Sequence, residues 1–532
     1  MSKIEILDTT LRDGSQGQGI VFSVSDKLAV VQALDELGLT WIEAGNPGSN
    51  PKDMEFFRQI KSLKLTNSQI CAFGTTRKKG IKPQDDNLLQ NLLVAGAETL
   101  VIVGKSWDLH VREVLKAGLE ENLLMISDTV SYLKTKRKKV FFDAEHFFDG
   151  YRENNSYALS SLKAASNAGA DLIVLCDTNG GSFPDDITRA IKAVKEQIPD
   201  IKLGIHAHND SGLAIANSIA AVKAGCVHVQ GTIAGFGERC GNTALAALLP
   251  SLELKLGLEA LPKGNLVLLS SLTRRVAEIA NVLLCDNMPY VGSHAFSHKA
   301  GMHSDGVLKT RRSFEHIDPA AIGNDRHFLM SEAGGKAAIA ERVKKFEPCI
   351  TKEHPMAAAL AAKLKEMEAK GWAFEGADAS FELLVRKELA SMEGRGKYKP
   401  LFQIEAYRVM NEHPANNALA CSNAWVKVLV KDQHEIAAAE GEGPVNALDS
   451  ALRKALIRFF PNLAKVRLED YKVRVIDGNE ATAARVRVLI KSTDGLKSWN
   501  TVGVSPDIID ASRSALVDSI EYKLISDMEA QG

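Results

Sequence analysis

Two histidines separated by one residue, His206 and His208, end an apolar run in the segment LGIHAHND. Side chains in a strand alternate between two faces, so both imidazoles would project from the same face. Far upstream, the segment DTTLRDG contains Asp13. Two imidazoles and one carboxylate can form a facial metal site with open positions, provided that the fold brings the three residues together.

The donor set leaves the identity of the metal open. Two neutral imidazoles and a carboxylate suit Mn²⁺, Zn²⁺ or Co²⁺ better than Mg²⁺. Asn242, in the segment GFGERCGN, offers an amide oxygen as a further ligand, and together with water it would favour the geometry of harder cations.

Arg12 directly precedes Asp13 and is a candidate for chemistry at the metal. A permanent cation in this place suits polarisation of a carbonyl oxygen or anchoring of a carboxylate. Glu43 ends a predicted strand and is a candidate for the same substrate site. The alternative is that Arg12 and Glu43 form a purely structural ion pair.

Other polar residues also follow predicted strands. Asp143 and Glu145, in the segment FFDAE, share one face, and a carboxylate there is a candidate for a catalytic role or for orienting Arg12. Thr178 and Asn179 are candidates for binding a substrate carboxylate. His303, in the glycine-containing segment AGMHSDG, resembles an ordinary surface histidine when it is taken alone.

Eight short β-like runs alternate with amphipathic helical patterns up to residue 256. The predicted strands span 4–7, 41–44, 69–73, 99–103, 140–143, 172–176, 202–206 and 228–232. Eight such units favour an α/β fold, a closed parallel (β/α)8 TIM barrel, over an open doubly wound sheet. The polar candidates follow the strand ends, where barrels build their active sites. Closure would also make the first, seventh and eighth strands neighbours, which brings Asp13 to the histidine pair.

The alternation stops after the barrel, which we place at residues 1–256. Residues 257–380 are predicted to form a helical subdomain and linker, with helices around 265–284, 335–346 and 354–370. Residues 381–532 are predicted to form a C-terminal α+β domain, which contains two βββα repeats over about 401–461 and 462–525. Such a duplicated module binds a ligand or dimerises between its copies, or it has only a structural role.

The composition of the 532 residues is that of an ordinary globular protein. The net charge of −1 gives no reason to expect a nucleic-acid partner or an acidic membrane surface. No apolar run has the length of a membrane span, and no cationic, apolar leader opens the chain. Seven cysteines without a CxxC pair predict reduced thiols, so a cytoplasmic protein is expected.

The motifs DTTLRDGSQ, HAHND, GxGERCGN and AGMHSDG occur in an order that resembles the isopropylmalate, homocitrate and citramalate synthases. These enzymes condense an acyl-CoA on a metal-dependent barrel. The segments GNPGSNPKDMEFF, SWDLHVREVL, FDAEHFFDGY and VLCDTNGG resemble the citramalate synthase branch most closely. The resemblance covers nearly the whole chain, and the tail resembles the family's regulatory domain, which senses a branched-chain end product.

The resemblance implies roles for particular residues. The metal ligands would be Asp13, His206, His208 and Asn242, while Arg12 would hold the keto oxygen of a 2-oxo acid and Thr178 its carboxylate. Glu145 would be an acid/base partner, and His303 would reach over the barrel from the 257–380 segment to help enolise acetyl-CoA. Phe314 stands where related chains tend to carry tyrosine.

The reaction implied by the resemblance is a metal-dependent acyl transfer from acetyl-CoA to pyruvate, which gives (R)-citramalate and CoA. It would open a pyruvate-derived isoleucine pathway, in a homodimer inhibited by isoleucine at the C-terminal domain. The alternatives are isopropylmalate synthesis from 2-oxoisovalerate, homocitrate synthesis from 2-oxoglutarate, a lyase on the same barrel, or an inactive sensor or binding protein. Retention of Arg12, Asp13, Glu145, His206 and His208 argues against the inactive sensor.

Overall fold

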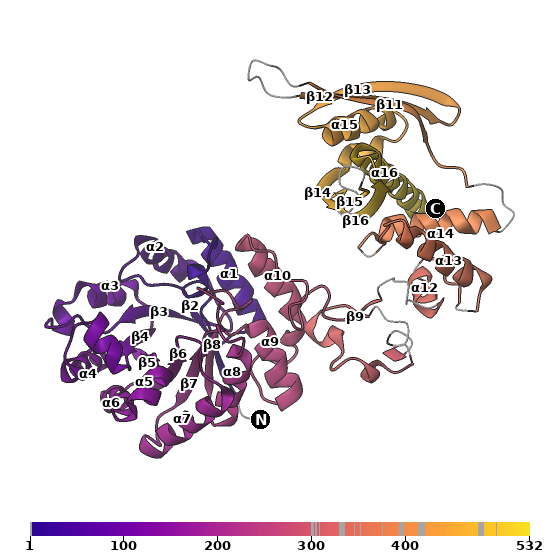
Figure 1. Ribbon diagram of the computed structural model, residues 1–532. Coiled ribbons are helices and arrows are strands. Elements are labelled where there is room, and N and C mark those ends of the chain that lie inside the picture. The colour runs from indigo at the N-terminus through magenta and orange to yellow at the C-terminus, as the bar shows by residue number, and fades with distance from the viewer. Residues whose placement is uncertain are drawn as a thin grey trace. The chain divides into compact units, whose positions relative to one another are not determined.

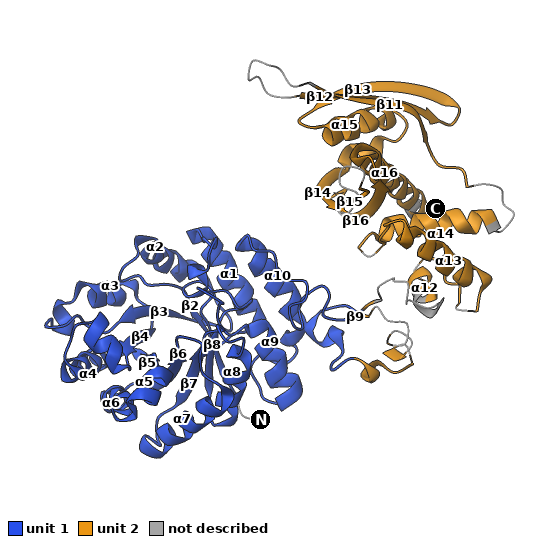
Figure 2. Ribbon diagram, in the orientation of Figure 1, with its two compact units in different colours: residues 1–296, 315–326 blue, residues 297–314, 327–532 orange. Residues whose placement is uncertain are grey.

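The structure is a computed structural model that describes residues 3–298, 303, 306–307, 309–328, 336–344, 346–351, 353–374, 376–392, 398–412, 421–476, 484–495 and 497–531. Residues 300–302 and 304–305 of the AGMHSDG motif, and residues 335 and 345 of the helix expected at 335–346, lie outside these ranges. The chain forms two compact units, one of residues 1–296 and 315–326 and one of residues 297–314 and 327–532 (Figure 2).

The first unit is built on eight parallel strands that close into a barrel with the strand order β1 to β8 (Figure 1). The strands are β1 (Glu5–Asp8), β2 (Trp41–Glu43), β3 (Gln69–Thr75), β4 (Thr99–Lys105), β5 (Lys139–Glu145), β6 (Leu172–Asp177), β7 (Leu203–Ala207) and β8 (His228–Gly231). Strand β1 pairs with both β2 and β8, which closes the barrel. The predicted barrel is confirmed, and the open sheet is excluded.

Helices surround the strands (Figure 1). They are α1 (Val24–Leu37), α2 (Pro51–Gln59), α3 (Asn87–Ala95), α4 (Leu119–Thr135), α5 (Phe147–Glu153), α6 (Asn155–Asn167), α7 (Pro184–Gln197), α8 (Ala214–Lys223), α9 (Leu245–Pro250) and α10 (Leu269–Ile279). Helix α1 shows local control of the helix ends: Ser23 and Asp26 form a capping box, and Gly38 ends the helix at φ +94°. Helix α10 is shorter than the expected 265–284 because a 3₁₀ turn precedes it and Asn281 follows it at φ +54°.

The core of the first unit has an inner and an outer layer. Inside the barrel, Trp41, Phe141 and Val174 pack together, and the larger outer layer lies between the strands and the helices. On β5 the inward side chains Phe141, Asp143 and Glu145 follow one another toward the carboxyl end of the strand. The packed interior therefore gives way to polar groups at that end of the barrel.

The second unit contains helices and two three-stranded antiparallel sheets. Its elements are β9 (Ser297–His298), β10 (His327–Phe328), α12 (Lys336–Val343), α13 (Pro355–Ala369), α14 (Asp378–Met392), β11 (Gln403–Glu412), β12 (Cys421–Val430), β13 (Gln433–Gly441), α15 (Pro444–Ile457), β14 (Arg467–Val475), β15 (Val486–Thr493), β16 (Ser498–Ser505) and α16 (Ile508–Gln531). The two βββα repeats are confirmed. Helix α14 continues across the expected boundary at residue 380, and the expected domain ranges stay predictions. Within the described ranges, no helix combines the length and the apolar character that crossing a membrane requires.

Candidate active site

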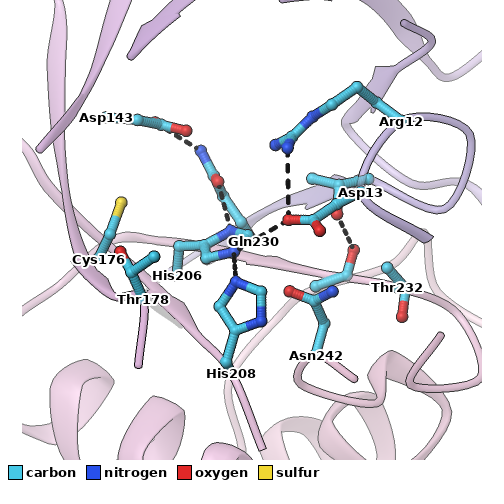
Figure 3. Close-up of polar contacts among 12 residues, drawn as sticks. Arg12, Asp13, Asp143, Cys176, Thr178, His206, His208, Gln230, Thr232 and Asn242 are labelled. Atoms are coloured by element: carbon cyan, nitrogen blue, oxygen red, sulfur yellow. Dashed lines mark hydrogen bonds and ion pairs between the residues drawn. The ribbon is translucent and has the colours of Figure 1, made fainter. Parts of the chain in front are cut away.

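Closure of the barrel brings Asp13, His206 and His208 together (Figure 3). Their candidate ligand atoms all lie within 4.8 Å of one another, and all three residues are buried. Nε2 of His206 is 3.2 Å from Oδ2 of Asp13 and 3.3 Å from Nε2 of His208. Strand β7 carries the first histidine and leads directly into the second, while Asp13 lies in the turn after β1.

The orphaned polar atoms of this cluster fit a divalent cation. Nδ2 of Asn242 donates to the carbonyl oxygen of Phe236 at 3.0 Å, whereas its buried Oδ1 has no hydrogen-bond partner in the described part of the chain. Asn242 also forms an isolated β-bridge with His208, which places it beside the cluster. An amide oxygen, a carboxylate and two imidazoles match the donor set that the sequence indicated.

The electrostatics favour the ligand forms of Asp13 and His208, whereas at His206 burial lowers the pKa but the contact with Asp13 outweighs burial and raises it. Burial raises the pKa of Asp13, but Arg12 and the two histidines outweigh burial and hold this pKa well below its usual range. Burial, aided by His206, lowers the pKa of His208 to about 3. An ionised carboxylate and a neutral imidazole are the forms that bind metal ions.

Arg12 is held in place from two sides. Its Nε donates to Oε2 of Glu43 at 2.6 Å, and its guanidinium carbon lies 4.1 Å from the ring centroid of Phe73. Its Nη1 is 3.4 Å from Oδ2 of Asp13. Glu43 is fully buried, and burial raises its pKa against the opposing effect of Arg12.

A cavity of about 570 Å³ opens over the cluster and is lined by Arg12, Asp13, Glu145, Thr178, His206 and His208, among other residues. Oγ1 of Thr178 accepts a hydrogen bond from the backbone N–H of His146 at 2.9 Å, which leaves the hydroxyl hydrogen available to another acceptor. Glu145 forms an ion pair with Lys105 across the β4–β5 register. Glu43 and Asn179 are not among the lining residues: Glu43 contacts Arg12, and Asn179 donates to Asp149 at 3.0 Å.

His303 belongs to the second compact unit. It is exposed, and its ring stacks on that of Phe314 with 4.2 Å between the centroids. Its expected place over the barrel stays a prediction.

Two contact residues were missed from the sequence, Gln230 and Lys105. Gln230 on β8 lies between His206 and Asp143, and its side-chain amide contacts both of them (Figure 3). The available signal was a glutamine in the middle of the predicted strand 228–232, whose side chain could face the barrel interior. Lys105 ends β4, and its partner in the pairing of β4 with the neighbouring strand β5 is Glu145. This contact could have been predicted only if the register between the two strands had been known.

Comparison with known proteins covers all three parts of the chain. A family model described as HMGL-like matches residues 3–274, one described as homocitrate synthase post-HMGL domain-like matches residues 290–371, and the LeuA allosteric (dimerisation) domain matches residues 375–524. The (R)-citramalate synthase of Aquifex aeolicus is 48% identical over 99% of this chain and 99% of its own length. Those of Geobacter sulfurreducens and Synechocystis are 46% and 45% identical, over 100% and 98% of this chain and 99% and 96% of their own.

These matches follow one another in sequence order from the barrel to the C-terminal repeats. They confirm the resemblance that the motifs indicated. The chain therefore belongs to the HMGL-like family and, over its full length, to the family of (R)-citramalate synthases.

Proposed function

We propose that this protein is a metal-dependent acyltransferase that condenses acetyl-CoA with pyruvate and water to give (R)-citramalate and CoA. The observation that carries the proposal is its full-length kinship with (R)-citramalate synthases. The geometry supports it, because a candidate metal cluster, an arginine and a free hydroxyl donor all face one cavity. The reaction would be the first step of a pyruvate-derived route to isoleucine.

The metal would be held by Asp13, His206, His208 and Asn242. A divalent ion (Mn²⁺, Mg²⁺, Zn²⁺ or Co²⁺) bound there supplies Lewis acidity toward the carbonyl oxygen of the 2-oxo acid. The orphaned Oδ1 of Asn242 and the low pKa of His208 support this ligand set.

Arg12 and Thr178 would bind the 2-oxo acid. Arg12 presents its guanidinium to the cavity in an orientation fixed by Glu43 and Phe73, so it can stabilise negative charge that develops on the carbonyl oxygen. Thr178 would donate its hydroxyl hydrogen to the substrate carboxylate, since the His146 N–H already occupies an acceptor position of its oxygen. Glu43 would act on the substrate through Arg12.

The condensation needs a base for the methyl group of acetyl-CoA. Glu145, which lines the cavity, or His303, from the second unit, would accept a methyl proton. The resulting enolate carbon would form a bond to C2 of the 2-oxo acid while the π bond between C2 and its oxygen breaks, and the alkoxide oxygen would then take a proton to become the hydroxyl of the product. Water then cleaves the thioester and releases CoA as a thiol, which drives the condensation forward. Both residues stay candidates for the base.

The test is a free-thiol assay of CoA release with acetyl-CoA and pyruvate, 2-oxoisovalerate or 2-oxoglutarate in turn. We expect the highest kcat/KM with pyruvate and an (R)-configured product on chiral chromatography. Asp13→Ala and His206→Ala should abolish CoA release. A higher kcat/KM with another oxo acid would reassign the substrate, and near wild-type turnover without metal would refute the mechanism.

The C-terminal domain would regulate the enzyme and join two copies of the chain. The match to the LeuA allosteric (dimerisation) domain supports a homodimer with an amino-acid effector, for which isoleucine is the candidate. Light scattering should give twice the chain mass, and isoleucine should lower activity and shift Tm. Unchanged activity and Tm in saturating isoleucine would remove it as the effector.

A further inference from the structure

We infer that Gln230, held by Asp143, is a positioning residue that presents Nε2 of His206 to the metal. The inference rests on the metal site proposed above and adds two residues that are not ligands. It concerns how the protein selects one of the two tautomers of the neutral His206 ring, the one with the hydrogen on Nδ1.

The three side chains form a buried chain of hydrogen bonds across the barrel (Figure 3). Nε2 of Gln230 donates to Oδ1 of Asp143 at 3.0 Å, and Oε1 of Gln230 lies 2.9 Å from Nδ1 of His206. Gln230 is fully buried, and Asp143 is 3% exposed. Strands β5 and β8 are not neighbours in the closed barrel, so the contact spans its interior.

With Asp143 ionised, the donors and acceptors of these three side chains have only one consistent direction, which is the one that the structure has. A carboxylate oxygen accepts, so the NH₂ group of Gln230 must face Asp143 and its oxygen must face His206. With the amide reversed, Oε1 of Gln230 and Oδ1 of Asp143 would be two acceptors facing each other. Because the amide oxygen can only accept, Nδ1 of His206 must carry the hydrogen.

A neutral imidazole protonated on Nδ1 has its lone pair on Nε2. That atom is the one that faces Oδ2 of Asp13 at 3.2 Å and Nε2 of His208 at 3.3 Å. The arrangement is the usual one for a ligating histidine, whose other nitrogen donates to an acceptor that fixes ring and tautomer. Here the acceptor is an amide whose own direction is set by a carboxylate.

His208 provides the contrast within the same cluster. Its buried Nδ1 has no hydrogen-bond partner in the described part of the chain, so no side chain there selects its tautomer. His206 is therefore the imidazole that the protein orients before the metal binds, and affinity should depend on Gln230.

The test is a calorimetric titration of the metal-stripped full chain with Mn²⁺. Gln230→Met removes both hydrogen bonds at similar side-chain volume, and we expect Kd to rise about 10- to 100-fold. The double variant Gln230→Glu/Asp143→Asn keeps an oxygen acceptor for Nδ1 of His206 and exchanges donor and acceptor in the second hydrogen bond, so it should retain most of the affinity. His228→Leu is the matched control, because His228 lies on the same face of β8 as Gln230 and is buried to the same extent. The Kd of this variant for Mn²⁺ should equal that of the wild type.

A wild-type Kd for Gln230→Met would overturn the inference, provided that Asp13→Ala loses Mn²⁺ binding in parallel. If Asp13→Ala also binds like the wild type, the proposed metal site fails instead. Should Gln230→Met not fold, Asp143→Leu frees the amide to turn and must weaken binding in the same direction. A fall in metal-free Tm with unchanged Kd would mark Gln230 as merely structural.

Discussion

The variant Arg12→Met distinguishes two interpretations of Arg12. In the first, the guanidinium acts on the substrate; in the second, it only neutralises the buried carboxylate of Glu43. Glu43 is fully buried, and Arg12 is its hydrogen-bond partner at 2.6 Å. The Arg12 side chain is only 15% exposed, so solvent screens the pair weakly. Removal of Arg12 leaves a buried carboxylate without its counter-ion.

The magnitude follows from the cost of an uncompensated buried charge. Breaking such a pair costs about 3–5 kcal/mol, which corresponds to about 6–20 °C in Tm for a barrel of this size. Burial already raises the pKa of Glu43 against the effect of Arg12, so the pKa must rise further in the variant. A carboxyl with a raised folded-state pKa loses its stabilising contribution as the pH rises through that pKa, so Arg12→Met should be destabilised more at pH 8 than at pH 5.

The assay pairs thermal unfolding with CoA release and includes the double variant Arg12→Met/Glu43→Gln. The double variant should regain most of the lost Tm, because position 43 no longer carries a charge and Asp13 keeps its contact with His206. Its turnover should stay at least about 100-fold below wild type, the usual loss for one donor to a developing oxyanion. Recovery of turnover in the double variant would refute the chemical role of Arg12. A Tm loss in Arg12→Met that is equal at pH 5 and pH 8 would refute the electrostatic reasoning.

Three further outcomes test the metal and the buried charges. EDTA should lower the Tm of the wild type, and Mn²⁺ at 100 times its Kd should raise the free energy of unfolding again by about 2.7 kcal/mol. Asp13→Ala should show neither change. A wild-type Tm that EDTA leaves unchanged would contradict the metal site. Burial raises the pKa of Asp8 from 3.8 to about 7 against hydrogen bonds from Thr10, so its stabilising contribution is lost as the pH rises across that interval. Asp8→Asn should therefore gain Tm relative to the wild type between pH 5 and pH 8, and a constant difference would contradict this. Lys27→Met breaks a buried pair with Asp53 at 2.6 Å and should cost about 3–5 kcal/mol, measured by urea unfolding; an unchanged midpoint would rule out this contribution.

Much of the barrel could be predicted because its strands are buried on both faces. Such strands read as short apolar runs, and every residue of β6 and β7 is indeed buried. Helix α5 was not predicted, since its seven residues are too few to show a helical period. It also begins after His146 at φ +56°, a backbone conformation that no residue pattern announces.

The grouping of Asp13, His206 and His208 as a candidate metal cluster could be predicted, because strand alternation and barrel closure are enough to place the three residues. The position of His206 on its strand sets the face of the ring, and closure supplies Asp13. Gln230 and Asp143 could not be connected in this way, because they belong to strands that are not neighbours and meet only across the interior. Alternation predicts that both point inward, but their contact depends on the width of the barrel and on side-chain length.

The buried charges argue against a barrel that serves only as a sensor. Burial raises the pKa values of Glu43 and Asp143, so keeping either carboxylate ionised in the folded chain costs free energy. Well-packed apolar residues of similar volume would often be neutral or stabilising in such positions. These carboxylates lie near Arg12, where burying them costs free energy. Their presence fits an electrostatically preorganised site, which needs fixed charges and dipoles that water cannot screen. The Arg12→Met/Glu43→Gln variant should then be about as stable as the wild type at pH 8 and still catalytically impaired, which is the pattern of charges retained for chemistry.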